Sequence, residues 1–99
     1  MVTRQVRLTI NDAPIELDHF VQGYIEHVVG GILSSLRGTG EIAGVDLSIA
    51  GDQVSIVLND AAVPLNPFAT QIIRNTMVGV VSSLKGVRTI ERMQVSIRR

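Results

Sequence analysis

The sequence predicts an α+β fold in which one unit occurs twice: a strand, a short hairpin arm, a helix and a second strand. Three observations predict it: the 99-residue chain repeats itself, apolar residues alternate at both ends of each repeat, and they recur at three and four positions in between. Two such units match the ferredoxin-like plan, a two-layer sandwich with an antiparallel sheet and both helices on one face. A β-grasp-like fold is the alternative, because each unit opens with a hairpin followed by a helix.

The repeat is clearest in LSSLRG, which ends at Gly38, and VSSLKG, which ends at Gly86, 48 positions later. Placing residues 6–49 on residues 54–97 needs no gap and gives 15 identities in 44 positions. A unit of this size lies near the length below which a single core is rarely stable alone. We therefore expect one domain over residues 1–99, built like a fused dimer from two pseudo-symmetric repeats.

The first part of each unit has the pattern of a β-hairpin. Alternating apolar residues predict a strand with one buried face. The dipeptide Asn-Asp follows, which tolerates the positive φ of a tight turn, and a short apolar alternation after it predicts a return arm. These strand, turn and arm segments are residues 6–10, 11–12 and 15–17 in the first unit and 54–58, 59–60 and 63–65 in the second.

A helix follows each hairpin. Asp18 and Asn66 are good N-caps, and Pro67 suits the first helical position. The helices are expected to end at Arg37 and Lys85, whose charges favour a helix C-terminus, and the glycine after each is a suitable C-cap. Wide apolar stripes are expected to lie on the sheet. They comprise Phe20, Tyr24, Ile25, Val28, Val29, Ile32, Leu33 and Leu36 in the first helix, and Phe68, Ile72, Ile73, Met77, Val80, Val81 and Leu84 in the second.

Each unit closes with a second strand. Apolar residues alternate again at 45–49 and at 93–97, which predicts strands with one buried face. Residues 50–53, AGDQ, predict a tight reverse turn between the two units.

Charge and composition exclude several classes of function. Nine basic and nine acidic residues give a net charge of zero, and hence no general attraction to nucleic acid or acidic lipid. The absence of cysteine removes disulfides, thiol nucleophiles and thiolate metal ligands. The start of the sequence lacks the apolar region of a signal peptide, and no apolar stretch is uninterrupted over the about 20 residues of a membrane span. We expect a soluble, cytoplasmic protein.

Both predicted helices carry a glycine and a serine four positions apart on one face: Gly31 with Ser35, and Gly79 with Ser83. Glycine inside a helix costs roughly 0.5–1 kcal/mol relative to alanine, so its occurrence in both units predicts the close approach of another backbone. That neighbour is expected to be the other helix or a second subunit. We therefore predict helix packing or an interface at these four residues.

Catalysis and metal binding find little support in the sequence. Glu16, Asp18, His19, Glu26 and His27 form an acidic, histidine-bearing patch, but only in the first unit, and its two histidines are eight positions apart. Such residues serve metal binding and acid–base chemistry when they converge, whereas a solvated helix face explains them here. We expect no enzymatic activity, no cofactor and no metal site.

Weak nucleic-acid binding is the alternative function. Arg4, Arg7, Arg92, Arg98 and Arg99 make the terminal strands locally basic, and RNA-binding relatives of the ferredoxin-like plan stack bases on the open sheet face. No aromatic residue alternates outward to supply that stacking. Arginines that protect sheet edges from strand pairing explain much of the same pattern.

The segment LNPFATQIIRNTMVGVVSSLKGV, residues 65–87, resembles a motif of small uncharacterised prokaryotic proteins. In that family an LNPF…SSLKG helix sits between a short hairpin and a strand. The resemblance covers residues 54–97 well and residues 6–49 more loosely, because LDHF replaces LNPF there. The family carries no established activity, so the resemblance implies a compact module and transfers no catalytic residues.

The function expected from these features is that of a non-enzymatic protein-interaction or self-assembly module. The expected partner is the chain itself, as a homodimer, or another protein, and no membrane is expected to take part. A small-ligand site between the helices and the sheet is a further alternative.

Overall fold

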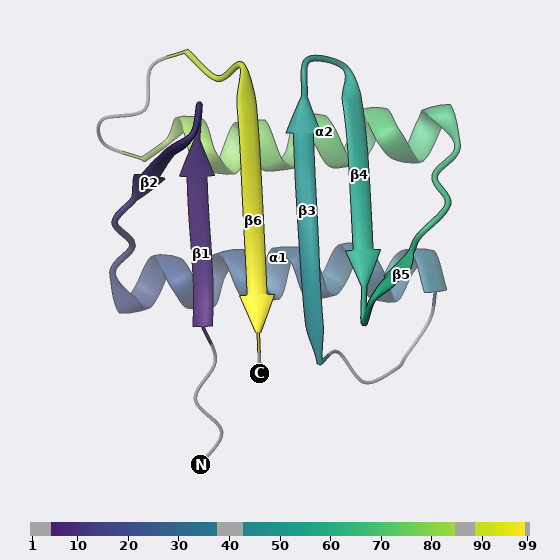
Figure 1. Cartoon of the computed structure of the whole chain (residues 1–99), viewed down its shortest axis with the longest axis horizontal. Coiled ribbons are helices and arrows are strands. Elements are labelled where there is room, and N and C mark those ends of the chain that lie inside the picture. The colour runs from purple at the N-terminus through teal and green to yellow at the C-terminus, as the bar shows by residue number, and fades with distance from the viewer. Residues whose placement is uncertain (1–4, 38–42, 85–88, 99) are drawn as a thin grey trace.

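The computed structural model of the chain describes residues 5–37, 43–84 and 89–98. Within these residues it contains one six-stranded sheet and two helices (Figure 1). In chain order the elements are β1 (Gln5–Ile10), β2 (Ala13–Ile15), α1 (His19–Arg37), β3 (Gly44–Ala50), β4 (Gln53–Leu58), β5 (Ala61–Ala62), α2 (Pro67–Ser82) and β6 (Arg92–Arg98).

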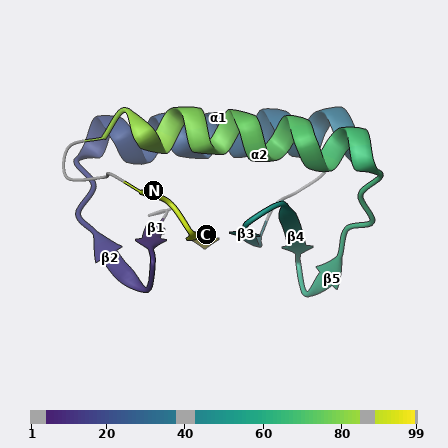
Figure 2. The same cartoon turned by 90° about the horizontal axis from the view of Figure 1, so that it is seen from above.

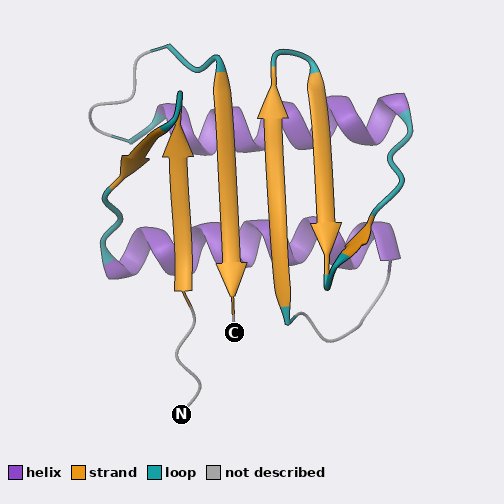
Figure 3. Cartoon of the chain, viewed as in Figure 1, coloured by secondary structure: helices purple, strands orange, loops and turns teal. Residues whose placement is uncertain are grey.

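The sheet is antiparallel throughout, with the strand order β2-β1-β6-β3-β4-β5. Both helices lie on the same face of the sheet (Figure 2), so the molecule is a two-layer slab with extents of 38 × 34 × 18 Å. The helices run across the strands (Figure 3), and the colours of Figure 1 show that the two helices run in opposite directions. The predicted α+β class, with an antiparallel sheet and both helices on one face, is confirmed. The ferredoxin-like topology and its β-grasp-like alternative are not.

The Asn-Asp dipeptides form the predicted hairpin turns. Ile10 pairs with Ala13, which makes residues 11–12 a two-residue loop, and residues 59–60 form the same loop in the second hairpin. Both asparagines have a φ of 50° and both aspartates a φ of 67°. Positive φ at both central residues is the type I′ geometry, which matches the twist of the flanking strands. The short strands β2 and β5 that follow these turns form the two edges of the sheet.

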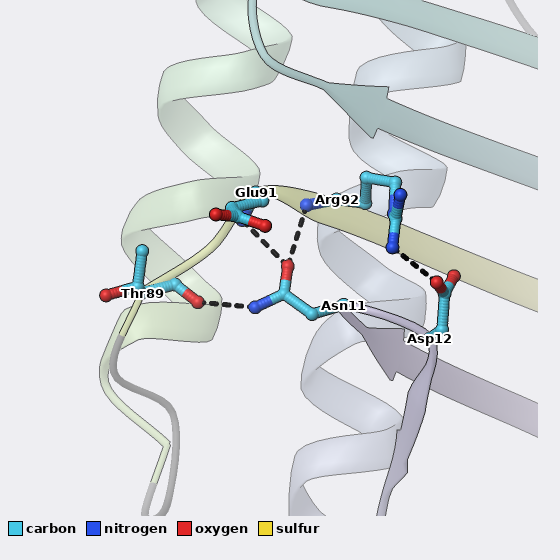
Figure 4. A network of polar contacts seen from close by, with 5 residues as sticks. All are labelled: Asn11, Asp12, Thr89, Glu91 and Arg92. Atoms are coloured by element: carbon cyan, nitrogen blue, oxygen red, sulfur yellow. Dashed lines mark hydrogen bonds and ion pairs between the residues drawn. The ribbon is translucent and has the colours of Figure 1, made fainter.

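The asparagine of the first turn anchors the start of β6. Asn11 Oδ1 accepts hydrogen bonds from the backbone N–H groups of Glu91 and Arg92, at 2.8 and 2.9 Å (Figure 4). Asn11 Nδ2 donates to the carbonyl of Thr89 at 2.8 Å, and Arg92 also forms an ion pair with Asp12. One turn thereby satisfies several backbone groups of a segment about 80 residues away in the sequence.

The second turn does the same for β3. Asn59 Oδ1 accepts hydrogen bonds from Ala43 N at 2.8 Å and from Gly44 N at 3.0 Å. Residues 43 and 44 are the counterparts of 91 and 92 under the 48-residue shift. Each half of the chain therefore holds the start of the last strand of the other half.

The helices begin where the sequence predicts. Asp18 Oδ1 accepts a hydrogen bond from Val21 N at 2.8 Å, and Asn66 Oδ1 accepts one from Ala69 N at 2.7 Å. Each is the N-cap bond that satisfies an otherwise unpaired donor of the first turn. Pro67 occupies the first position of α2, where its missing N–H costs nothing.

The end of α2 differs from the prediction. The helix ends at Ser82, with Ser83 as its C-cap, so the expectation that it continues to Lys85 is wrong. The hydroxyls of Ser82 and Ser83 bond back to backbone carbonyls of the last turn, an alternative to continued helix that serine offers. Lys85, Gly86 and Gly38 lie outside the described residues.

The core is one aliphatic layer between the sheet and the helices. The buried helix residues are spaced by four: Ile25, Val29 and Leu33 in α1, and Ile73, Met77 and Val81 in α2. The four long strands contribute Leu8, Ile10, Val45, Leu47, Ile49, Ile56, Leu58, Met93, Val95 and Ile97. Among the described residues, each member of this core except Val63 has a buried counterpart 48 positions away. Neither described helix is long and apolar enough to cross a membrane.

Candidate interaction surface

Five large apolar side chains are exposed on the helix layer. Phe20 is 76% exposed, Phe68 72% and Tyr24 51%, and Leu36 and Ile72 are exposed as well. The prediction that these residues face the sheet is wrong for all of them except Leu36. The sheet side of both helices is filled by the core, and Phe20, Tyr24, Phe68 and Ile72 lie on the side that points away from it. Leu36 follows Ile25 by eleven residues, about three turns, so it lies on the sheet side and is exposed at the end of α1. We call the surface formed by Phe20, Tyr24, Phe68 and Ile72 the outer helix face.

Helical geometry explains why part of the apolar stripe is exposed. Successive residues of an α-helix are rotated by about 100°, so Tyr24 points well away from its buried neighbour Ile25. Residues spaced by four, such as Ile25, Val29 and Leu33, already fill the side of α1 that meets the sheet. The apolar stripe in the sequence is wider than the strip that one flat sheet covers.

The outer helix face carries no formal charge. Among residues 19–36 and 67–82, no exposed position holds Asp, Glu, Lys or Arg, and the charged residues Glu26 and Arg74 are half-buried. Arg74 turns toward the β3–β4 loop, where its Nε donates to Gly51 O at 2.7 Å and lies 3.7 Å from Asp52 Oδ1. A depletion of charge together with exposed aromatic residues is typical of the core of a protein interface.

An open groove of about 460 Å³ separates the two helices on this side. Its lining comes from the start of α1 (Phe20, Val21 and Tyr24) and from the end of α2 and the residues after it (Thr76, Gly79, Val80, Ser83 and Leu84). The rings of Phe20 and Tyr24 stack with their centroids 6.3 Å apart. An aromatic ridge on α1 therefore borders a hollow lined on the α2 side by a glycine and a serine.

Two of the four predicted packing residues line this groove, and the other two are exposed on α1. Gly79 and Ser83 line the groove, and Gly31 and Ser35 are the equivalent residues of α1. Apart from their own helical surroundings, no described atom lies within 4 Å of a Cβ built on Gly31 or on Gly79. The other helix therefore does not pack closely on these glycines. The prediction that the other helix is their close neighbour is wrong. A second subunit at these positions stays a prediction.

The serines add little polarity to the surface. Ser35 Oγ donates to Gly31 O at 3.1 Å, and Ser83 Oγ donates to Gly79 O at 3.2 Å. Because each hydroxyl hydrogen is already bonded within its own helix, covering these serines leaves no unpaired donor. The glycine–serine pairs therefore shape the face without adding a charged or unsatisfied group.

The opposite broad face of the slab is the uncovered side of the sheet, and it is polar. Arg98 Nη2 donates to Asp46 Oδ2 at 2.7 Å, and its side chain passes over Gly44, where a Cβ would lie 2.9 Å from Nη1. This bond lowers the pKa of Asp46 below its ordinary value of 3.8; partial burial opposes the shift, and a hydrogen bond with Ser96 adds to it. The exposed or half-buried strand residues that alternate with the core on this face include Gln5, Arg7, Thr9, Asp46, Ser48, Ser55, Gln94, Ser96 and Arg98.

The arginines predicted to contact nucleic acid are partly engaged in ion pairs. Arg92 is bound to Asp12 and Arg98 to Asp46, which reduces the positive charge that they offer to phosphate. Arg7 is exposed on β1. Arg4 and Arg99 lie outside the described residues, and nucleic-acid binding stays a prediction.

The acidic, histidine-bearing patch of the first repeat does not come together as a site. Asp18 caps α1, and His27 Nδ1 donates to Gly23 O at 2.7 Å within the helix. Among the residues that the structure describes, no three His, Asp or Glu side chains are grouped as a metal ion would require.

Comparisons with protein families, with curated proteins and with solved structures find no match for this chain. The resemblance of residues 65–87 to a family of small prokaryotic proteins stays a prediction.

Proposed function

We propose that this chain is a non-enzymatic protein-interaction module that binds its partner through the outer helix face. The observation that carries the proposal is a pair of exposed apolar clusters on a helix layer without exposed charge: Phe20 with Tyr24 at the start of α1, and Phe68 with Ile72 at the start of α2. Removing apolar surface from water is favourable by about 25 cal/mol per Å². Clusters of exposed apolar side chains that are rimmed by polar residues mark interaction sites.

The finer proposal for the fold is an internal duplication, a fused dimer of two split β-α-β units. Strand pairing supports it. Val6 pairs with Ile97 across β1 and β6, and their counterparts Val54 and Ile49 pair across β4 and β3. In the first half, α1 lies between β1 and β3 in the chain, and β6 from the second half lies between these two strands in the sheet. In the second half, α2 lies between β4 and β6 in the chain, and β3 from the first half lies between them in the sheet. Split β-α-β units of this kind also make up the ferredoxin-like plan.

The middle of the sheet supports the same proposal. β3 and β6 are counterparts that pair with each other, with Leu47 opposite its own counterpart Val95. This is the pairing expected of two identical units across a twofold axis. Such an axis also relates the two halves of the outer helix face, Phe20 to Phe68 and Gly31 to Gly79.

The double variant Phe20→Ala with Phe68→Ala tests the proposed binding surface. Both side chains are more than 70% exposed, so the circular dichroism spectrum should not change. We expect the wild type to associate with itself or to retain a partner from a lysate of its native organism, and the variant to do neither. The matched control is Arg7→Ala with Gln94→Ala on the polar sheet face, which should behave as the wild type. Equal association by all three proteins, or by none, would contradict the proposal.

A second candidate function is the binding of a small apolar ligand in the groove. Its volume of about 460 Å³ supports this candidate, because ligand pockets fall in the range of roughly 300–1,000 Å³. The groove lies between the two helices, on the side away from the sheet. The sequence-based alternative had expected a ligand site elsewhere, between the helices and the sheet. A ligand that binds the native state must raise the midpoint of thermal unfolding, and a screen without any such shift rules this candidate out.

A further inference from the structure

We infer that the partner is a second copy of this chain, which covers the outer helix face with its own outer helix face. The inference rests on the proposed function, because it names the occupant of the same surface. The resulting dimer has four layers: sheet, helices, helices and sheet. Size, charge and shape each favour this occupant.

The face is large enough for a stable dimer. An aromatic side chain buries about 150–250 Å², so Phe20, Phe68 and Tyr24 at their observed exposures offer roughly 300–500 Å² to a partner. Each partner in an interface of standard size buries about 800 Å². Three side chains thus supply about half of that area, and the broad face of the slab, 38 by 34 Å, has room for the rest.

The absence of charge favours a copy of the same chain over a charged partner. A face with a net charge repels its own copy and attracts surfaces of opposite sign. Here the exposed positions of residues 19–36 and 67–82 carry neither carboxylates nor cationic groups other than the two histidines, which are counted as neutral at pH 7. Two copies therefore meet without repulsion and without desolvating an ion.

The residues that form the groove and its ridge have equivalents in the other half of the face. Phe20 stands beside the hollow of Gly79 and Ser83, and the equivalent residues of the other half are Phe68, Gly31 and Ser35. The space above both glycines is open among the described atoms. A twofold dimer brings the same patch of both copies together, so the groove and the aromatic ridge beside it in one copy meet those of the other.

The other surfaces are less suited to self-association. The two sheet edges are β2, which contains Pro14, and the two-residue strand β5, which is soon followed by Pro64. Short edges with proline discourage pairing with another strand. The uncovered sheet face is polar and carries the Arg98–Asp46 ion pair. The apolar area available for a dimer is concentrated on the helices.

Three proteins test the inference: the wild type, Gly79→Leu and Gly30→Ala. Outside its own helical surroundings, no described atom lies within 4 Å of a Cβ at position 79, but a leucine there fills the hollow that the second copy needs. Alanine at position 30 also replaces an unhindered helical glycine, with a side chain of one methyl group. In dilute solution, both substitutions should raise the midpoint of thermal unfolding by a few degrees, because glycine is a poor helix former.

The readout is the molar mass by light scattering over a range of concentrations. We expect the wild type and Gly30→Ala to become dimers as the concentration rises. Gly79→Leu and the double variant Phe20→Ala with Phe68→Ala should weaken dimerisation at least tenfold, and this result would support the inference.

Three results would overturn the inference, and they differ in what they leave standing. A monomeric wild type that binds another protein through Phe20 and Phe68 refutes the second copy and retains the proposed function. A monomeric wild type that instead binds neutral lipid vesicles through these residues refutes both. A dimer unaffected by Gly79→Leu and by the double variant refutes the assignment of this face, and with it the proposed binding surface.

Discussion

At the scale of single residues, the two turn asparagines connect local geometry with the tertiary fold. Each adopts a positive φ that most residues avoid, and each presents its side-chain oxygen to two backbone N–H groups at the start of a distant strand. Asn11 and Asn59 were predicted as turn residues from the dipeptide alone. Their bonds to residues 91–92 and 43–44 could not be predicted, because they depend on which strands become neighbours.

Replacing Asn11 by glycine isolates the contribution of its side chain. Glycine accepts the φ of 50° without strain, so the loss comes from the three hydrogen bonds to Thr89, Glu91 and Arg92. We expect Asn11→Gly to lower the free energy of unfolding by about 1–2 kcal/mol. Asn11→Ala should cost about 1 kcal/mol more, because alanine is strained at this φ. Urea unfolding measures both, and a glycine variant as stable as the wild type would show that these bonds contribute nothing.

The ion pair between Asp46 and Arg98 makes stability depend on pH in the acid range. The pKa of Asp46 is lowered in the folded state, so its contribution is present above its ordinary value of 3.8 and is lost as the pH falls through the lowered value. At pH 7, Asp46→Asn should cost at most about 1 kcal/mol, because both side chains are about half exposed. The wild type and the variant should converge in stability as the pH falls below the lowered pKa of Asp46. A difference that stays constant from pH 7 to pH 2 would exclude this explanation.

At the scale of elements, the sequence predicted where turns and helices begin better than which side of each helix is buried. The Asn-Asp turns and the caps Asp18 and Asn66 depend on neighbouring backbone atoms, and the sequence contains all the information they need. Phe20 and Phe68 were assigned to the core because helical spacing shows how wide an apolar stripe is, but not how much of it a sheet will cover. The sequence does contain a sign of an exposed interaction surface, because the side of the helices opposite Ile25 and Ile73 lacks charged residues.

The glycines of α1 provide a test at this scale. The counterpart of Gly30 is Val78, and no described atom outside its own helical surroundings lies within 4 Å of a Cβ built on Gly30. Gly30→Ala should therefore raise the free energy of unfolding by roughly 0.5–1 kcal/mol, through the better helix propensity of alanine. Thermal unfolding of dilute protein should show a midpoint higher by several degrees. A lower midpoint would reveal a contact at Gly30 that the structure does not contain.

At the scale of the whole molecule, the sequence predicts two units but not how their strands are shared. The repeat of residues 6–49 in 54–97 fits many arrangements. The observed one places β6 between β1 and β3, so that each half completes the sheet of the other. Pairing across such distances is decided by the fit of the whole core, which local patterns do not report. The outcome is a thin slab with one polar sheet face and one helix face that lacks exposed charge and carries exposed aromatic residues.

The most direct test of the pairing of two such slabs is a distance between spin labels. The chain has no cysteine, so Ser55→Cys places a single label on each copy, on the polar sheet face of β4. In a dimer that joins outer helix faces, the two labels lie on opposite outer surfaces, roughly two slab thicknesses of 18 Å apart. We predict this long distance in the wild-type background and its loss in Gly79→Leu. A short distance between the labels, or the absence of any dipolar signal at high concentration, would contradict the account.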